Sequence, residues 1–344
     1  MKALQYVGAK KVEVREVSMI PPAPGQARIR VTYCGVCGSD IGIYSGKHPR
    51  AKAPLTIGHE FVGVIEEING EANGLQIGDR VAAYPLLSCG SCYACRTGRD
   101  YICGQLRLIG IDLDGGMAEY VNCSTDALFR LPKNVPDSVC AVIEPLAVAV
   151  HSVRRSKFKP LDSAAVIGAG PIGILIRLVL KDSGASRIVI SDISKPRLAL
   201  CEAFGFETVD SQAESLGAYI AKTTGGEGVN IVYECSGVAA GAAEMTYPVC
   251  ADGMICLVGV HKEARSVMLS DMHFRELNMT ATRVYAKEEF RQTTAYIAKL
   301  QNEIAKIVTD VIPLEESEQV FEYIAEPANA AVKVVIQCEK EAKG

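Results

Sequence analysis

The sequence lacks an excess of basic residues. Its 344 residues include 36 Lys and Arg against 40 Asp and Glu, which leaves a formal net charge of −4 and a pI near 5.9. Proteins that bind nucleic acid usually carry a basic excess on one face, so this balance argues against that class of function. With 49% hydrophobic and 22% charged residues, the composition is that of an ordinary globular chain rather than a disordered one.

Long apolar runs are also missing. No window approaches the roughly 18 apolar residues of a membrane-spanning helix, and the densest run, residues 164–180, is interrupted by glycines, Pro171 and Arg177. The amino-terminal residues alternate polar and apolar side chains, without the apolar core of a signal peptide. We therefore expect a cytoplasmic protein, long enough for two domains of roughly 150 residues. The lysines of residues 339–343 are expected to form a solvated tail.

The chain changes character near Ser163. On both sides of the central region, short alternating segments predict strands, at residues 28–33, 61–68, 79–84, 311–314 and 332–336. In the central region, apolar strands are expected at residues 164–167, 187–190, 230–234 and 254–258. These alternate with stretches of helical period, which is the pattern of a parallel sheet built from βαβ units. A further helix is expected over residues 288–300.

Thirteen cysteines need an explanation in a chain expected to meet reducing conditions, where disulfide networks are rare. Four of them follow the spacing C-x2-C-x2-C-x7-C, at Cys89, Cys92, Cys95 and Cys103. Four thiolates can close a tetrahedron around Zn²⁺ and leave no position for water, so we predict a structural zinc site. An iron–sulfur cluster uses the same ligand number, and free core cysteines are common. The small, turn-forming residues between these thiols favour the zinc lobe.

A second set of potential ligands is spread over three segments. Cys37 offers a thiolate, His59 and Glu60 an imidazole and a carboxylate, and Glu144 a second carboxylate. Mixed N, S and O ligands with one position left for water are typical of catalytic zinc. Taken singly, His59 can be a hydrogen-bonded core histidine and Cys37 a small buried hydrophobe. Glu144 lies in the apolar run 142–150, where a lone charge is costly without a partner or cation.

A glycine-rich turn directly follows a predicted strand and opens a helix. It reads Gly168-Ala-Gly170-Pro171-Ile172-Gly173, and Asp192 ends the next strand about 20 residues on. The glycines allow a tight turn and close approach of a pyrophosphate, which the helix amino terminus favours. Asp192 can accept the adenosine ribose hydroxyls and repel a 2′-phosphate, which predicts NAD as the cofactor. An ordinary βα turn is the alternative.

Together and in this order, these segments resemble the zinc-dependent medium-chain dehydrogenases, over nearly the whole chain. Residues 143–151 are similar to the polyol (sorbitol) dehydrogenase branch, because ethanol-type members have a cysteine where Glu144 stands. Residues 109–120, 274–277 and 282–283 are similar to bacterial hexonate dehydrogenases acting on L-galactonate, L-gulonate or L-idonate at C5.

The resemblance implies an α/β fold with two parts. A GroES-like, β-rich catalytic domain is expected over residues 1–152, with the structural zinc lobe at 86–106. A doubly wound Rossmann NAD-binding domain is expected over 153–285, and residues 286–344 return to the catalytic domain. The family also implies a homo-oligomer, a dimer or tetramer.

For the catalytic zinc, the resemblance implies Cys37 and His59 as ligands. The third protein ligand is Glu60 in some relatives and the later glutamate, here Glu144, in others, and both alternatives stay open.

Three further residues concern the proton. Ser39 matches the hydroxyl that accepts the substrate proton and passes it to the nicotinamide ribose. Several relatives have a histidine five residues after the zinc cysteine, and Gly42 replaces it here. Water or His48 can complete the outer end of this relay, and a plain surface histidine is the alternative for His48.

The resemblance also adds binding residues. Arg197 is expected over the adenine ring, with an exposed helix arginine as the alternative, and Val258 joins the cofactor set. Arg283 is expected to pair with a substrate carboxylate, a structural salt bridge being the alternative.

The predicted activity is reversible oxidation of a secondary alcohol on a polyol or sugar acid by a zinc- and NAD-dependent enzyme with two zinc ions per chain. A threonine- or butanediol-type dehydrogenase and an NAD-binding structural protein are the alternatives.

Overall fold

The computed structural model of the chain describes residues 1–326 and 330–339. It divides into two compact units, one formed by residues 1–144 and 286–344 and the other by Pro145–Tyr285. The predicted tail lies outside the described residues apart from Glu339, which forms an ion pair with Arg30. No helix in the described ranges is both long and apolar enough to cross a membrane.

The first unit is built mainly from β-strands. Among the described residues its largest sheet has the order β10-β6-β5-β3-β18-β17, with β9 also pairing with β3. A second sheet has the order β2-β1-β4, and β7 pairs with β8. The strands are β1 (Lys2–Gly8), β2 (Lys11–Glu16), β3 (Gln26–Gly35), β4 (Leu55–Thr56), β5 (Glu60–Asn69), β6 (Arg80–Ala83), β7 (Leu86–Leu87), β8 (Arg107–Leu108), β9 (Tyr120–Ser124), β10 (Leu128–Arg130), β17 (Val308–Pro313) and β18 (Lys333–Gln337).

The described helices of the first unit are short except for α10. They are α1 (Gly38–Tyr44), α2 (Tyr93–Arg96), α3 (Asp137–Cys140), α10 (Lys287–Ile307) and α11 (Val320–Ala325), with 3₁₀ turns η1 (Asp100–Ile102), η2 (Thr125–Ala127) and η3 (Leu314–Gln319). Helix α4 (Ile143–Arg155) begins at the end of the first unit and continues into the second. α10 buries an apolar stripe that includes Phe290, Ile297 and Ile304, as the helical period of residues 288–300 predicts.

Strand β3 organises the first unit because it pairs with strands from distant parts of the sequence. Its side chains alternate between buried and half-buried positions, which is the period of a strand with one face on the core. Gly35 at its end lies opposite Glu60 of β5 and Val335 of β18. The sheet therefore brings residues near positions 35, 60 and 335 together.

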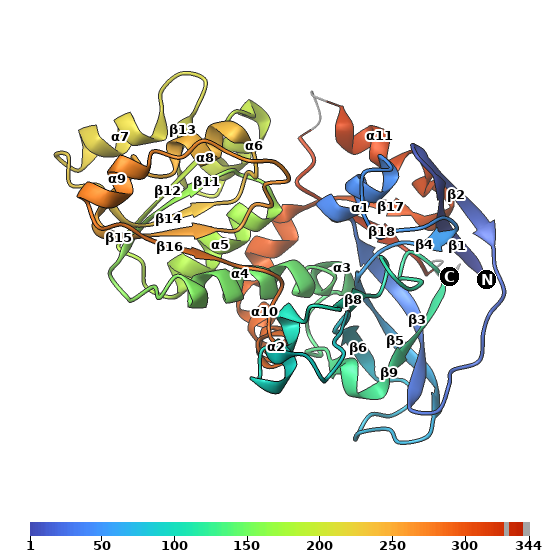
Figure 1. Cartoon of the computed structure of the whole chain (residues 1–344). Coiled ribbons are helices and arrows are strands. Elements are labelled where there is room, and N and C mark those ends of the chain that lie inside the picture. The colour runs from blue at the N-terminus through green and yellow to red at the C-terminus, as the bar shows by residue number, and fades with distance from the viewer. Residues whose placement is uncertain (327–329, 340–344) are drawn as a thin grey trace. The chain divides into compact units, whose positions relative to one another are not determined.

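The second unit is a parallel sheet with helices on both faces (Figure 1). Its strand order is β13-β12-β11-β14-β15-β16, which is the doubly wound dinucleotide-binding order. The strands are β11 (Ser163–Ile167), β12 (Arg187–Asp192), β13 (Glu207–Asp210), β14 (Val229–Glu234), β15 (Val249–Leu257) and β16 (Asn278–Ala281). The helices are α5 (Pro171–Asp182), α6 (Lys195–Ala203), α7 (Leu216–Thr223), α8 (Ala239–Glu244) and α9 (Leu269–Phe274).

The apolar strands of the second unit form its core. Ala165, Val189, Val232 and Ile255, one from each of four neighbouring strands, are fully buried in one cluster. A strand covered on both faces requires such apolar runs, so the fold class predicted from the sequence is confirmed.

The two units meet in the sequence at Glu144 and Pro145, whereas the resemblance places the limit at residue 152. Both positions lie in the continuous helix α4 (Ile143–Arg155), so no linker marks the change. The domain limits 1–152, 153–285 and 286–344 stay predictions.

Candidate functional site

Cys37 lies between strand β3 and helix α1. Its backbone amide donates to Asp40 Oδ2 at 2.9 Å, which satisfies one of the free donors at the start of this helix. The thiol is thereby fixed at the edge of the large sheet, and Asp40 is completely buried beneath it.

His59 and Glu60 enter the same place from the start of β5. Gly58 precedes them with φ +96°, and a Cβ there would lie 2.7 Å from Cys34 Sγ, so only glycine allows this turn. One ligand atom each from Cys37, His59 and Glu60 lies within 4.8 Å of the others. The structure therefore brings these three predicted residues together.

A buried carboxylate, that of Asp40, lies close to the His59 imidazole. His59 Nδ1 lies 3.9 Å from Asp40 Oδ1, and within the described residues neither atom has a hydrogen-bond partner. Burial alone lowers the pKa of His59, but the Cys37 thiolate, followed by Asp40 and Glu144, outweighs it and holds that pKa well above its usual value. For the Asp40 carboxyl, burial has the opposite sign and raises the pKa, because the charged form of an acid is the one that burial disfavours.

Lys333 is a functional candidate that the sequence interpretation missed. Its ammonium group forms an ion pair with Glu60 and donates to the Val36 carbonyl at 2.8 Å. Both charged side chains are only 2% exposed. A signal was present, because Lys333 stands in the apolar segment 332–336, where a lone charge demands a partner.

Glu144 is buried in the first turn of α4. It does not belong to the group of atoms that Cys37, His59 and Glu60 form. Its charge nevertheless raises the pKa of both His59 and Lys333.

The donor set of this site fits zinc. Sulfur, imidazole nitrogen and carboxylate oxygen are its usual ligands. The cluster also gathers acidic groups at Cys37, Asp40, Glu60 and Glu144 near the ammonium group of Lys333. Carboxylate oxygens and a thiol gathered in this way favour the binding of a divalent cation.

The residues predicted for the proton relay are all described by the structure, and their roles stay predictions. Ser39 Oγ is buried and, among the described residues, has no hydrogen-bond partner. His48 Nδ1 accepts the backbone amide of Ala51 at 3.2 Å, which fixes its ring in the loop after α1. Gly42 accepts hydrogen bonds from the amides of Lys47 and His48 through its carbonyl.

The four-cysteine lobe has the geometry of a tetrahedral metal site. The sulfur of Cys92 lies 3.5 Å from that of Cys95 and 3.8 Å from that of Cys103, and Cys89 Sγ lies 4.0 Å from Cys95 Sγ. Four sulfurs placed 2.3 Å from a central zinc would be about 3.8 Å apart. The four thiols therefore already stand at the spacing that zinc requires.

Backbone amides also prepare this lobe for thiolates. The amide of Cys92 donates to Cys89 Sγ at 3.4 Å, and that of Gln105 donates to Cys103 Sγ at 3.3 Å. Donation by the Ser91 amide, followed by its hydroxyl and the Cys92 amide, lowers the pKa of Cys89 to about 6. A thiolate is the form that binds a metal.

The glycine turn of the second unit is shaped for a phosphate. Gly168 has φ +105°, and a Cβ on Gly173 would collide with the Gly168 carbonyl oxygen. Gly170 faces open space, directly before the Pro171 that begins α5. These are the conditions under which a pyrophosphate approaches backbone and helix amino terminus.

A cavity of about 270 Å³ adjoins this turn and is lined by Gly168, Gly170, Asp192 and Arg197, among others. Asp192 Oδ2 accepts the Ala169 amide at 2.6 Å and its Oδ1 the Ser194 amide at 2.8 Å.

The other predicted cofactor residues lie around the same edge of the sheet. Pro171 and Ile172 are half-buried in the first turn of α5, and Val258 is half-buried directly after β15. Arg283 is exposed beyond β16, and its role stays a prediction.

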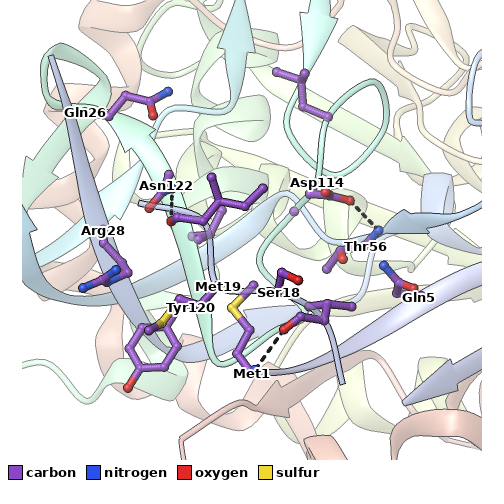
Figure 2. Close-up of a pocket in the computed structure, with 15 residues that line it drawn as sticks. Met1, Gln5, Ser18, Met19, Gln26, Arg28, Thr56, Asp114, Tyr120 and Asn122 are labelled. Carbon is purple, nitrogen blue, oxygen red and sulfur yellow. Dashed lines mark hydrogen bonds between the residues drawn. The ribbon is translucent and has the colours of Figure 1, made fainter. Parts of the chain in front are cut away.

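A separate cavity of about 400 Å³ lies in the first unit (Figure 2). It is bordered by the extended segment 17–20 and by β1, β3 and β9, and none of the predicted site residues lines it. Asn122 donates to the Ile20 carbonyl at 2.9 Å, and Asp114 accepts the Thr56 amide at 2.9 Å. These polar groups hold the cavity walls together.

Comparison with known proteins agrees with this geometry. Residues 23–133 match the alcohol dehydrogenase GroES-like domain, and residues 171–299 match the zinc-binding dehydrogenase family. A 2-dehydro-3-deoxy-L-galactonate 5-dehydrogenase from Pseudoalteromonas atlantica is 35% identical over 315 residues, covering 91% of this chain and 92% of the relative.

Two solved structures share the whole architecture. One is 2R,3R-butanediol dehydrogenase from Bacillus subtilis, with a TM-score of 0.90 and 29% identity over 98% of this chain and 99% of that one. The other is a putative zinc-binding dehydrogenase from Sinorhizobium meliloti bound to NADP, with a TM-score of 0.92 and 31% identity over 98% of both chains. The resemblance stated from the sequence is therefore confirmed: the chain belongs to the zinc-binding alcohol dehydrogenase family and is an oxidoreductase.

Proposed function

We propose that this dehydrogenase interconverts a secondary alcohol and a ketone on a polyol or sugar acid, with NAD(H) as the hydride carrier. The observation that carries the proposal is the cluster of half-buried Cys37 with buried His59 and Glu60, close enough to Glu144 for its charge to act on His59. The similar 5-dehydrogenase from Pseudoalteromonas atlantica, named for a sugar acid, supports this substrate class.

In this proposal Cys37 and His59 hold the catalytic zinc. Asp40 faces His59 Nδ1 and orients the ring, as second carboxylates do for many zinc histidines. The ion pair with Lys333 holds the Glu60 carboxylate beside the other two ligands, so we assign Glu60 as the third ligand in the resting enzyme. Glu144 is then the exchanging carboxylate.

Zinc supplies Lewis-acid polarisation of the bound alcohol, and NAD supplies the hydride chemistry. Ser39 Oγ, which has no hydrogen-bond partner within the described ranges, would accept the proton of the substrate hydroxyl while it passes its own proton to the nicotinamide ribose. The glycine turn and Asp192 bind the pyrophosphate and the adenosine ribose, and Arg197, which lines the same cavity, is proposed to lie over the adenine ring. Asp192 disfavours a 2′-phosphate, so NAD is preferred to NADP.

The cysteine lobe is proposed to hold the structural zinc. A homo-oligomer, dimer or tetramer, and a cytoplasmic location complete the proposal and are supported by family analogy. Light scattering coupled to size-exclusion chromatography measures the oligomeric state. Fractionation of the source cells tests the cytoplasmic location.

A screen with a metal count tests the function. Initial rates with NAD and NADP are measured over hexonates, polyols, butanediol and threonine, beside zinc content per chain. We expect two zinc ions, preference for NAD and the highest kcat/KM on a hexonate or polyol. Butanediol is the second candidate, because a butanediol dehydrogenase shares the fold. Highest activity on threonine, or preference for NADP, would contradict the proposal.

Carboxylate recognition is tested separately at Arg283. If Arg283 binds the carboxylate of a sugar acid, Arg283→Ala lowers kcat/KM on the sugar acid and spares the matching polyol. Equal losses on both would remove carboxylate recognition from this residue.

A further inference from the structure

A buried acidic residue links the loops that follow β14 and β15 in the second unit. Glu234 ends strand β14 and has no exposed surface. Its carboxylate accepts the amides of Ser236 and Gly237 at 2.9 and 3.1 Å and the Ser236 hydroxyl. Its other oxygen lies 2.8 Å from His261 Nε2. These hydrogen bonds fix the position of the Glu234 side chain between the two loops.

The same residue holds the next loop through its main chain. The Glu234 carbonyl accepts the amides of Val258 and Gly259 at 2.9 and 2.8 Å. The backbones are so close that a Cβ on Gly259 would lie 2.8 Å from Glu234 Oε2 and would collide with the Gly237 amide. The loops after β14 and β15 are therefore packed tightly against each other, and the His261 side chain adds a further contact between them.

This pair of loops lies on one side of the glycine turn. The sheet order places β14 and β15 on the opposite side of β11 from β12, and β12 carries Asp192. A dinucleotide crosses such a sheet at the turn after β11. With its adenosine over β12, its nicotinamide half lies over the loops after β14 and β15. Cys235, Ser236 and Val238 of the first loop already line the cavity.

The second ring nitrogen of His261, Nδ1, also bears on cofactor binding. A histidine that donates from Nε2 to a carboxylate presents Nδ1 as an acceptor when it is neutral. His261 Nδ1 is buried and has no hydrogen-bond partner in the part of the chain that the structure describes. A buried polar atom without a partner is costly, so this nitrogen is available to a donor of the bound cofactor or to a water beside it.

We propose that His261 is a positioning residue for the nicotinamide half of the dinucleotide, acting through Glu234 on residues 258–261. The inference rests on the proposed use of NAD(H). Loss of this side-chain hydrogen bond frees the end of the loop at His261, although Val258 and Gly259 keep their main-chain bonds to Glu234. The glycine turn and Asp192 are untouched. Binding of the nicotinamide portion is therefore weakened, and binding of the ADP-ribose portion is not.

Calorimetric titration of the zinc-loaded, full-length protein with NADH and with ADP-ribose tests this. His261→Ala should weaken NADH binding about tenfold, since the side-chain hydrogen bond that ties residue 261 to Glu234 is lost, and leave ADP-ribose affinity within about twofold. His261→Gln should restore most of the affinity, because its amide nitrogen can take the place of Nε2. His261→Asn should not, because its amide nitrogen stands nearer Nδ1.

His273→Ala is the matched control, an exposed histidine of the same unit, and should bind both ligands as the wild type does. Unchanged NADH affinity in His261→Ala overturns the inference, as does an equal loss for both ligands, which would mean a purely structural role. If the wild type binds ADP-ribose but gains nothing from the nicotinamide, the positioning role is refuted while the glycine turn keeps its function. If it binds neither, the proposed cofactor is itself wrong.

Discussion

The two groups of potential zinc ligands in the first unit differ in origin. The cysteine lobe draws its four thiols from 15 consecutive residues, 89–103, and three of the four are half-exposed. Cys37, His59 and Glu60 come from two segments, and the partners Asp40 and Lys333 lie under them, fully buried. The lobe is an all-sulfur set arranged by local turns, whereas the mixed set is arranged by the sheet.

This difference in origin predicts how the geometry of each site responds when the fold is disturbed. A short lobe with its own amide donors keeps its geometry if the rest of the unit is disturbed. The mixed cluster depends on the pairing of β3 with β5 and β18, so a disturbance of the sheet reaches it at once. We therefore expect the lobe to govern stability and the cluster to govern turnover.

The largest effect is expected from removal of a ligand of the mixed cluster. In Cys37→Ala and His59→Ala, turnover should fall to background while NADH affinity stays largely intact, since the dinucleotide residues are in the other unit. Zinc content should drop from two ions per chain to one. Normal activity in a Cys37→Ala protein that lacks this metal would refute the catalytic role of the cluster.

Ser39→Ala should lower kcat by about 10²–10⁴-fold, which is the usual contribution of a positioned proton acceptor. Zinc content and melting temperature should not change. Ser45→Ala serves as control, because this serine of the same segment donates its hydroxyl to the Gly42 carbonyl and has no proposed role in the relay. A pH–rate profile identical to that of the wild type would count against the relay.

Lys333→Met should destabilise the metal-free protein by about 3–5 kcal/mol, because it leaves the buried charge of Glu60 unpaired. Denaturant unfolding after removal of zinc measures this. Lys333→Arg keeps the charge, and the double variant Lys333→Met with Glu60→Gln should recover most of the loss. If the single and double variants are equally unstable, the ion pair does not hold Glu60.

The smallest effect on turnover is expected from the lobe. Cys92→Ser should lose the other zinc and lower the melting temperature, by about 2–4 °C for each kcal/mol that the lobe contributes. The kcat per folded molecule should stay near that of the wild type. A selective loss of kcat without a change in melting temperature would reverse the assignment of the two sites.

Most of the fold could be predicted because its signals are local. The apolar strands, the turn of Gly168 to Gly173 and the spacing of the four cysteines are each written in a short stretch of sequence. Strand limits shifted by a few residues, as for β15, which begins at Val249 rather than at residue 254.

The partners of the mixed cluster could not be predicted in the same way. Lys333 reaches Glu60 only because β18 pairs with β3, and they are 273 residues apart in the sequence. Asp40 stands three residues after Cys37 in the sequence, but no sequence pattern predicts that its carboxylate lies close to His59 Nδ1. Long-range strand register is the information that single-sequence patterns lack.

Gly35 shows how narrowly the cluster is confined. A Cβ at this position would strike the Glu60 carboxylate and lie 2.9 Å from Cε of Lys333, so even alanine would separate the pair. A library randomised at codon 35 and selected for growth on the natural substrate should return glycine alone. Adaptation of this enzyme to new substrates must then proceed through other positions, with this point of the backbone held constant.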